Sequence, residues 1–270
     1  MATRSPRKPS SKKASTTSRA KPAAISVSSL PLLGPDDDIM PMTSKLEESI
    51  EIANPQQPHC ATVLVLDTSG SMAGEKITAL NEGLKIFHKE VSKDELASKR
   101  VDLATVTFGS GATVLHDFAM ITELESPELT AAGSTPMGEA ILKATDLVEE
   151  RKQQYRDQGI DYYRPWIFLI TDGEPTDMRP GDAKWTEVLS RVRAGEASRK
   201  FMFFAVVVEP GNMDVLTKIA PTERPPLKLK GTKFAELFQW LSKSQKTLSA
   251  SKVGEQIKLP SAAGWTEISA

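Results

Sequence analysis

The sequence predicts an α/β fold with a doubly wound, mainly parallel central sheet, one antiparallel edge strand and helices on both faces. Two apolar runs, residues 63–66 and 166–170, stop abruptly at polar loops, as strands buried inside a parallel sheet do. Other segments carry apolar residues at helical spacing. Strands that alternate with helices indicate parallel strands joined by crossover helices.

The first predicted strand, residues 63–66, delivers Asp67 to the carboxyl edge of the sheet. Open α/β sheets place their ligand sites at that edge. An amphipathic helix follows, because its apolar residues form one stripe at helical spacing: Ile77, Leu80, Leu84, Phe87 and Val91. His88 lies beside the stripe, so we expect a partly exposed helix residue there.

The next two predicted strands form a hairpin. Residues 101–108 and 113–118 both have strand character, and the segment between them contains Gly109-Ser110-Gly111. A connection this short suits antiparallel strands, which places the second strand at the sheet edge.

The second half of the chain continues the alternation. The predicted elements are a helix over 138–155, the strand that ends before Asp172, a helix over 184–200, a strand over 201–208, a helix over 213–219, a strand over 225–229 and a last helix carrying Phe234, Leu237, Phe238 and Leu241.

We divide the chain into three parts: a disordered basic tail and linker (1–45), a domain (58–248) and a C-terminal extension (249–270) docked on the domain through Trp265. Residues 1–25 hold seven basic residues and no acid, and the rest of the chain holds 27 basic and 35 acidic residues. An acidic body does not favour specific nucleic-acid binding.

Composition also bears on the compartment. No apolar run approaches the roughly 20 residues of a membrane span. The single cysteine, Cys60, cannot form an internal disulfide. We therefore expect a cytoplasmic protein without a membrane span.

Oxygen-bearing side chains gather at the predicted strand ends. Asp67, Ser69 and Ser71 follow the first strand, Thr135 precedes a helix, and Asp172 ends the second apolar run. Carboxylates and hydroxyls are hard ligands that suit Mg²⁺, with Mn²⁺ and Ca²⁺ as alternatives. The simpler reading is a turn in which Ser71 caps the following helix.

The pattern Asp-x-Ser-x-Ser, a distant Thr and a distant Asp resembles the metal-ion-dependent adhesion site of von Willebrand factor A (VWA) domains, which have a Rossmann-like fold. Further stretches resemble the bacterial TerY-type A domains. These stretches are residues 67–74, 80–84, 162–165, 171–177 and 238–242.

The resemblance implies a function as well as a fold. Ser69, Ser71 and Thr135 would ligate Mg²⁺ directly, Asp67 and Asp172 would act mostly through water, and a protein partner would add an Asp or Glu. TerY-type proteins are associated with a serine/threonine kinase and a PP2C-like phosphatase in stress-response and tellurite-resistance systems. This chain resembles their scaffold member.

An enzyme is the alternative: a metal-dependent hydrolase acting on a phosphoester through the same loops. Glu174 and Asp177 are nearby acids that such chemistry would need. Against it, no histidine lies in the site loops, and the sequence has no glycine-rich phosphate cradle and no Gly-x-Ser-x-Gly elbow. We therefore expect a binding module and no catalytic residue.

Overall fold

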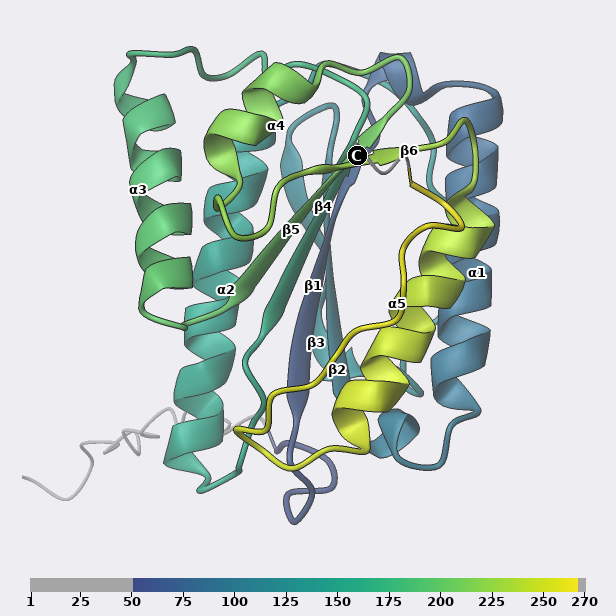
Figure 1. The fold of residues 1–270 in the computed structure, drawn as a ribbon, viewed down its shortest axis with the longest axis vertical. Coiled ribbons are helices and arrows are strands. Elements are labelled where there is room, and N and C mark those ends of the chain that lie inside the picture. Colours follow the sequence, from purple (N-terminus) through teal and green to yellow (C-terminus); the bar gives the residue numbers. More distant parts are fainter. Residues whose placement is uncertain (1–50, 267–270) are drawn as a thin grey trace, which may run out of the picture. The chain divides into compact units, whose positions relative to one another are not determined.

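The computed structural model describes residues 51–266, so the tail and linker predicted for residues 1–45 lie outside the described part. A six-stranded sheet in the order β3-β2-β1-β4-β5-β6 forms its centre (Figure 1). All neighbouring strands are parallel except β2 and β3. The strands are β1 (Cys60–Asp67), β2 (Val101–Phe108), β3 (Ala112–Met120), β4 (Trp166–Thr171), β5 (Met202–Val208) and β6 (Leu227–Leu229). The predicted fold class, including the antiparallel edge, is confirmed.

Helices cover both faces of the sheet. In Figure 1, α1 (Glu75–Ser92) and α5 (Phe234–Ser249) lie on one face. On the other face lie α2 (Met137–Asp157), α3 (Ala183–Ala197) and α4 (Met213–Ile219). Short 3₁₀ turns occur at Gly70–Met72 and Ala97–Lys99. No helix within residues 51–266 is long and apolar enough to cross a membrane.

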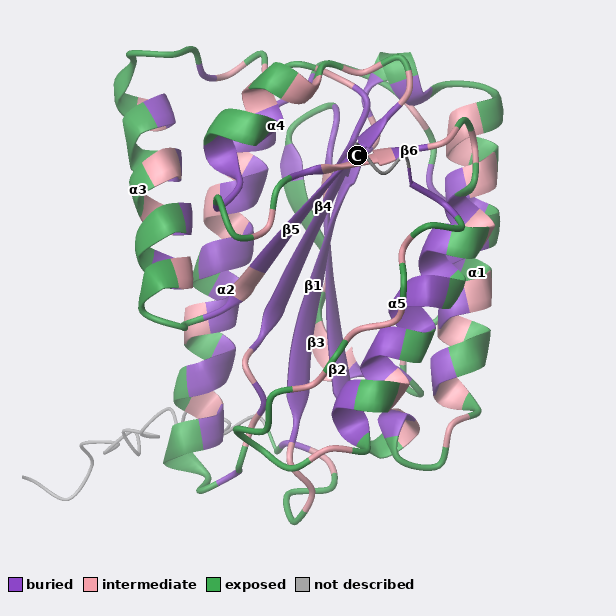
Figure 2. Ribbon diagram, viewed as in Figure 1, coloured by how far each residue is buried: buried purple, intermediate pink, exposed green. Residues whose placement is uncertain are grey.

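Each face of the sheet has its own apolar core. Along β1, Leu64 and Leu66 belong to the core beneath α1 and α5, whereas Val63 and Val65 belong to the core beneath α2 and α3. Successive residues of a strand point to opposite faces, so a strand covered on both sides must be apolar throughout. Figure 2 shows the central strands buried along their length.

Close packing of α1 against α5 depends on one glycine. A Cβ atom on Gly83 would lie 2.5 Å from Cδ2 of Phe238, which is closer than real atoms approach. Glycine therefore lets the Phe238 ring rest against the α1 backbone.

Two local predictions and one alternative interpretation need correction. Helix α1 begins at Glu75 with Gly74 as its N-cap, so Ser71 does not cap it. Helix α3 ends at Ala197, before Arg199 adopts a positive φ of 56°. Strand β6 starts only at Leu227, because Pro225 and Pro226 have no N–H to donate to a ladder.

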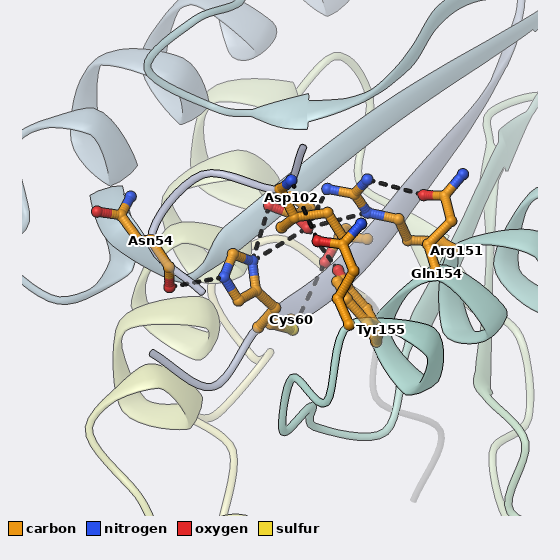
Figure 3. A network of polar contacts seen from close by, with 10 residues as sticks. Asn54, Cys60, Asp102, Arg151, Gln154 and Tyr155 are labelled. Atoms are coloured by element: carbon orange, nitrogen blue, oxygen red, sulfur yellow. Dashed lines mark hydrogen bonds and ion pairs between the residues drawn. The ribbon is translucent and has the colours of Figure 1, made fainter. Parts of the chain in front are cut away.

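A buried polar cluster ties the segment before β1 to β2 and α2 (Figure 3). The Asp102 carboxylate, fully buried on β2, accepts from Nδ1 of His59 at 3.1 Å, from Nη2 of Arg151 at 2.7 Å and from the Tyr155 hydroxyl at 2.5 Å. Cys60 is buried beside it, and burial raises the pKa of its thiol to about 12. The thiol is therefore inert at neutral pH.

The described part of the C-terminal segment lies against the body of the domain. The Trp265 side chain is 1% exposed and packs on Trp240, with ring centroids 5.5 Å apart. The indole N–H of Trp240 donates to the Pro260 carbonyl at 2.8 Å.

Candidate metal centre

The candidate site lies where the strand order reverses. Strand β1 is flanked by β2 on one side and β4 on the other. The chain leaves β1 toward α1 and β4 toward α3, and these helices lie on opposite faces of the sheet. A crevice forms at the carboxyl ends of strands at such a point. Asp67 is the last residue of β1, and Asp172 directly follows β4.

The first loop turns its oxygens inward. The backbone amide of Ser69 donates to Oδ1 of Asp67 at 2.8 Å, which folds the loop back over the strand end. The Oγ atoms of Ser69 and Ser71 lie 2.9 Å apart. Ser71 in turn donates to Oδ1 of Asp172 at 2.6 Å, so the first loop meets the loop after β4.

Thr135 lies on a third loop, the one that precedes α2. A Cβ atom on Gly173 would lie 3.3 Å from Oγ1 of Thr135 and 3.7 Å from Oδ2 of Asp67. Thr135 and Asp67 therefore both lie close to Gly173. The five side chains predicted for the site, Asp67, Ser69, Ser71, Thr135 and Asp172, are brought to one crevice by three loops that are distant in sequence.

Backbone hydrogen bonds hold the Thr135 loop in place. The Ala132 amide donates to the Thr68 carbonyl at 2.7 Å, and the Gly70 amide donates to the Gly133 carbonyl at 3.1 Å. Gly133 has a φ of 84°, and a Cβ there would lie 2.7 Å from the Gly109 carbonyl oxygen. Only glycine combines that conformation with that approach.

Two acids share the crevice with one cation. Burial, with a smaller contribution from Asp172, raises the pKa of Asp67 above its ordinary value despite hydrogen bonds from Ser69 and Thr171. The Lys76 ammonium from the first turn of α1 pairs with Asp172 and donates to the Ser71 carbonyl. Two carboxylates and one ammonium leave one negative charge in the crevice.

Sequence reasoning missed two of these contacts. No sequence pattern singled out Lys76, yet it pairs with Asp172, 96 positions away. The hydroxyl of Thr171, the residue that directly follows the apolar run 166–170, donates to Oδ2 of Asp67 at 2.5 Å. A polar residue at the last position of an otherwise apolar strand was the available signal for Thr171.

Glu174 and Asp177, the two acids that a hydrolase would need, both accept hydrogen bonds from groups outside the candidate metal site. Asp177 accepts from the amides of Gly138 and Glu139 at 3.0 and 2.9 Å, so it satisfies the first turn of α2. Glu174 is exposed and accepts from the side chain of Asn212 at 2.9 Å.

The residues present fit a hard divalent cation. The site offers carboxylate and hydroxyl oxygens and its charged side chains, Asp67, Asp172 and Lys76, carry a net negative charge. Within residues 51–266, no group of three or more His, Cys, Asp or Glu side chains could hold a metal ion. A metal ion at the candidate site would therefore need the hydroxyl oxygens as ligands in addition to the two carboxylates.

Comparison with known families agrees with this geometry. The family model described as "von Willebrand factor type A domain" matches residues 62–240, from the first strand to the last helix. The chain belongs to the von Willebrand factor type A domain family. This family comprises protein-interaction and adhesion modules.

Solved structures share the fold of this VWA domain. The pilus adhesin SpaC from Lactobacillus rhamnosus GG superposes with a TM-score of 0.55 at 13% identity. That match covers 71% of this chain and 31% of the adhesin, so the chain spans about a third of its length. The vWF domain of the type V pili tip protein Mfa5 from Porphyromonas gingivalis gives 0.50 at 12% identity, covering 74% and 99%. A search of curated protein sequences gives no match.

Proposed function

We propose that this VWA domain is a metal-dependent protein-binding module whose site residues Asp67, Ser69, Ser71, Thr135 and Asp172 hold Mg²⁺. The ion, when bound, would supply a positive centre that accepts an Asp or Glu side chain from a protein partner. The chain's own residues orient the oxygens and restrict water at the crevice.

The charge arrangement supports this proposal most directly. Asp67 is fully buried and Asp172 is 8% exposed, and the Lys76 ammonium is paired with only one of the two. Hydroxyls supply the remaining oxygens, so a divalent ion there would not be neutralised by the protein alone. An incoming carboxylate would therefore gain a strong and directional contact.

Removing one hydroxyl should abolish most metal binding without unfolding the domain. Thr135→Val keeps the side-chain volume but removes an oxygen ligand. We expect calorimetry to show one Mg²⁺ bound by the full chain and at least roughly tenfold weaker binding by the variant, about 1.4 kcal/mol. Thr217→Val, on the exposed side of α4, is the matched control and should bind like wild type.

The protein partner is tested with the same pair of variants. Wild type and Thr135→Val serve as baits, and a specific partner should be retained only by wild type, lost with EDTA and restored by Mg²⁺. Replacing the partner's contacting Asp or Glu by Asn or Gln should then abolish binding. A complex that survives EDTA would contradict the metal-dependent proposal.

Lys76 is expected to weaken metal binding, because its ammonium occupies one oxygen of Asp172 and adds repulsion. Lys76→Met should bind Mg²⁺ about three- to tenfold more tightly, or about 0.7 to 1.4 kcal/mol. Lys85→Met removes the same charge from the exposed face of α1 and should leave the affinity unchanged. Weaker binding by Lys76→Met would show that Lys76 instead helps to shape the site.

We propose a cytoplasmic scaffold in a stress-response or tellurite-resistance type phosphorylation system as its setting. The support is the resemblance of residues 171–177 and the other quoted stretches to TerY-type A domains. In that setting the partners would be a serine/threonine kinase and a PP2C-like phosphatase. Metal-dependent pull-down of either enzyme would test the assignment.

A further inference from the structure

An arginine-lined cavity lies between the end of α3 and the loop that joins α4 to β6. Its volume is about 390 Å³. Four arginines line it, Arg164, Arg193, Arg199 and Arg224, together with two acids, Glu196 and Glu223. We call this cavity the arginine pocket. Its charged lining carries a net charge of +2, although the chain as a whole is slightly acidic.

Two of the arginines are held in fixed positions by Glu196. Arg164 donates Nη2 to the Glu196 carboxylate at 2.5 Å and Nε to the Phe201 carbonyl at 2.8 Å. Arg224 donates Nη2 to the same carboxylate at 3.0 Å, and its guanidinium stacks on the Phe204 ring at 5.3 Å. Glu196 therefore fixes the positions of Arg164 and Arg224, and its carboxylate already accepts hydrogen bonds from both.

Several N–H groups of the arginines that line the pocket have no hydrogen-bond acceptor in the described part of the chain. Within residues 51–266 the Arg199 side chain has no partner, and the only side-chain bond of Arg193 is from Nη2 to the Lys218 carbonyl at 2.9 Å. Nε of Arg224 is buried and has no hydrogen-bond partner among the described residues. A buried donor without an acceptor costs free energy. The accessible donors without an acceptor are therefore those of Arg199 and the remaining nitrogens of Arg193, whereas Nε of Arg224 is closed to solvent.

The positively charged guanidinium groups of the pocket also lie close enough to repel one another. Burial lowers the pKa of Arg164, and although Glu196 raises it, the nearby guanidinium groups of Arg224 and Arg199 lower it further. An anion in the pocket would relieve this repulsion as well as satisfy the free donors.

We propose that the arginine pocket binds a phosphomonoester dianion, presented by a phosphorylated serine or threonine of another protein. Two negative charges match the +2 lining, and the planar guanidinium fork fits phosphate oxygens. The volume suits a phosphate with its attached residue. The lining contains no aromatic side chain on which a nucleobase could stack, which favours a phosphorylated side chain over a nucleotide.

The pocket is separate from the metal centre. Arg164 and Arg199 precede β4 and β5, whereas Asp67, Ser69, Ser71 and Asp172 lie at the carboxyl ends of β1 and β4, and Thr135 lies just before α2. A strand of six residues, such as β4, spans roughly 20 Å. The two sites can therefore be occupied independently, and this inference does not rest on the metal proposal.

Calorimetry on the full chain in EDTA tests the proposal. The probe is a phosphothreonine peptide with glycine and serine flanks, compared with the same peptide unphosphorylated. We expect only the phosphorylated peptide to bind, and Arg193→Gln/Arg199→Gln to weaken binding at least roughly tenfold. Both arginines are exposed, so the double variant should fold normally, which circular dichroism would check.

Arg179→Gln is the matched control, because Arg179 is an exposed arginine whose side chain makes no bond within the described residues. It should bind the phosphopeptide like wild type. Equal binding of both peptides, no binding at all, or an equal loss in the Arg179 variant would overturn the proposal. Displacement by AMP at lower concentration than by phosphopeptide would overturn the phosphoprotein source. Unchanged binding by Thr135→Val would support a site independent of the metal centre.

Discussion

Replacing Asp102 with asparagine is expected to destabilise the folded protein by about 3 to 5 kcal/mol. The variant keeps the side-chain shape but removes the charge that Arg151 and His59 face inside the protein. A buried charge that loses its partner keeps its desolvation cost without compensation. Urea denaturation at pH 7 measures the change, and the melting temperature should fall by roughly 6 to 20 °C.

The effect of this substitution should depend on pH. Burial alone would raise the pKa of Asp102, but the hydrogen bond from His59 and the charge of Arg151 outweigh it and hold the pKa below its ordinary value. The stability that the carboxylate contributes is thus present above about pH 4 and is lost as pH falls through the folded-state pKa. The difference between wild type and variant should shrink in that acidic range.

Asp146→Asn provides the control for this experiment. Asp146 pairs with Arg191 at the surface, where its side chain is 56% exposed, so its loss should cost less than about 1 kcal/mol. A cost for Asp102→Asn as small as that of the control would contradict a structural role for the buried cluster shown in Figure 3.

Leu237→Ala should cost about 2 to 5 kcal/mol. Leu237 lies on α5, is fully buried and belongs to the core that α1 and α5 form on the sheet. The substitution removes packed methyl groups and leaves a cavity that neighbouring helices can only partly fill. Chemical denaturation monitored by circular dichroism gives the value.

Leu115→Ala is the matched control for the core variant. Leu115 lies on the edge strand β3 and is 40% exposed, so truncation removes little packed area and should cost less than about 1 kcal/mol. If Leu237→Ala were equally mild, α5 would contribute much less to the core than its burial indicates.

The two proposed sites make the domain a candidate for bridging partners. An acidic side chain would bind at the metal centre at the carboxyl ends of β1 and β4, and a phosphorylated side chain would enter the arginine pocket near the amino-terminal ends of β4 and β5. Because the sites use different elements, substitutions can disable one and leave the other intact.

Local patterns were sufficient to predict most of the architecture. The strand ending at Asp67 and the strand ending before Asp172 were each recognisable because a strand buried on both faces must be apolar without interruption. The gap at Gly109-Ser110-Gly111 predicted the antiparallel edge, because so short a connection cannot cross over the sheet. Helix ends were less predictable, because Arg199 reaches the left-handed region without a glycine signal.

The sequence by itself determined the fold class and the positions of the main strands and helices, because these depend on periodicity. It also placed Asp67 and Asp172 at strand ends, whereas the full set of five candidate metal-site residues came from the resemblance to VWA domains. Only the tertiary structure decided that Lys76 pairs with Asp172, that Asp177 satisfies the first turn of α2 and that Asp102 is surrounded by donors. It also decided that four arginines from separate segments line one cavity. The physical reason is that such contacts depend on how helices and loops pack on the sheet, and the spacing of residues along one element does not specify that packing.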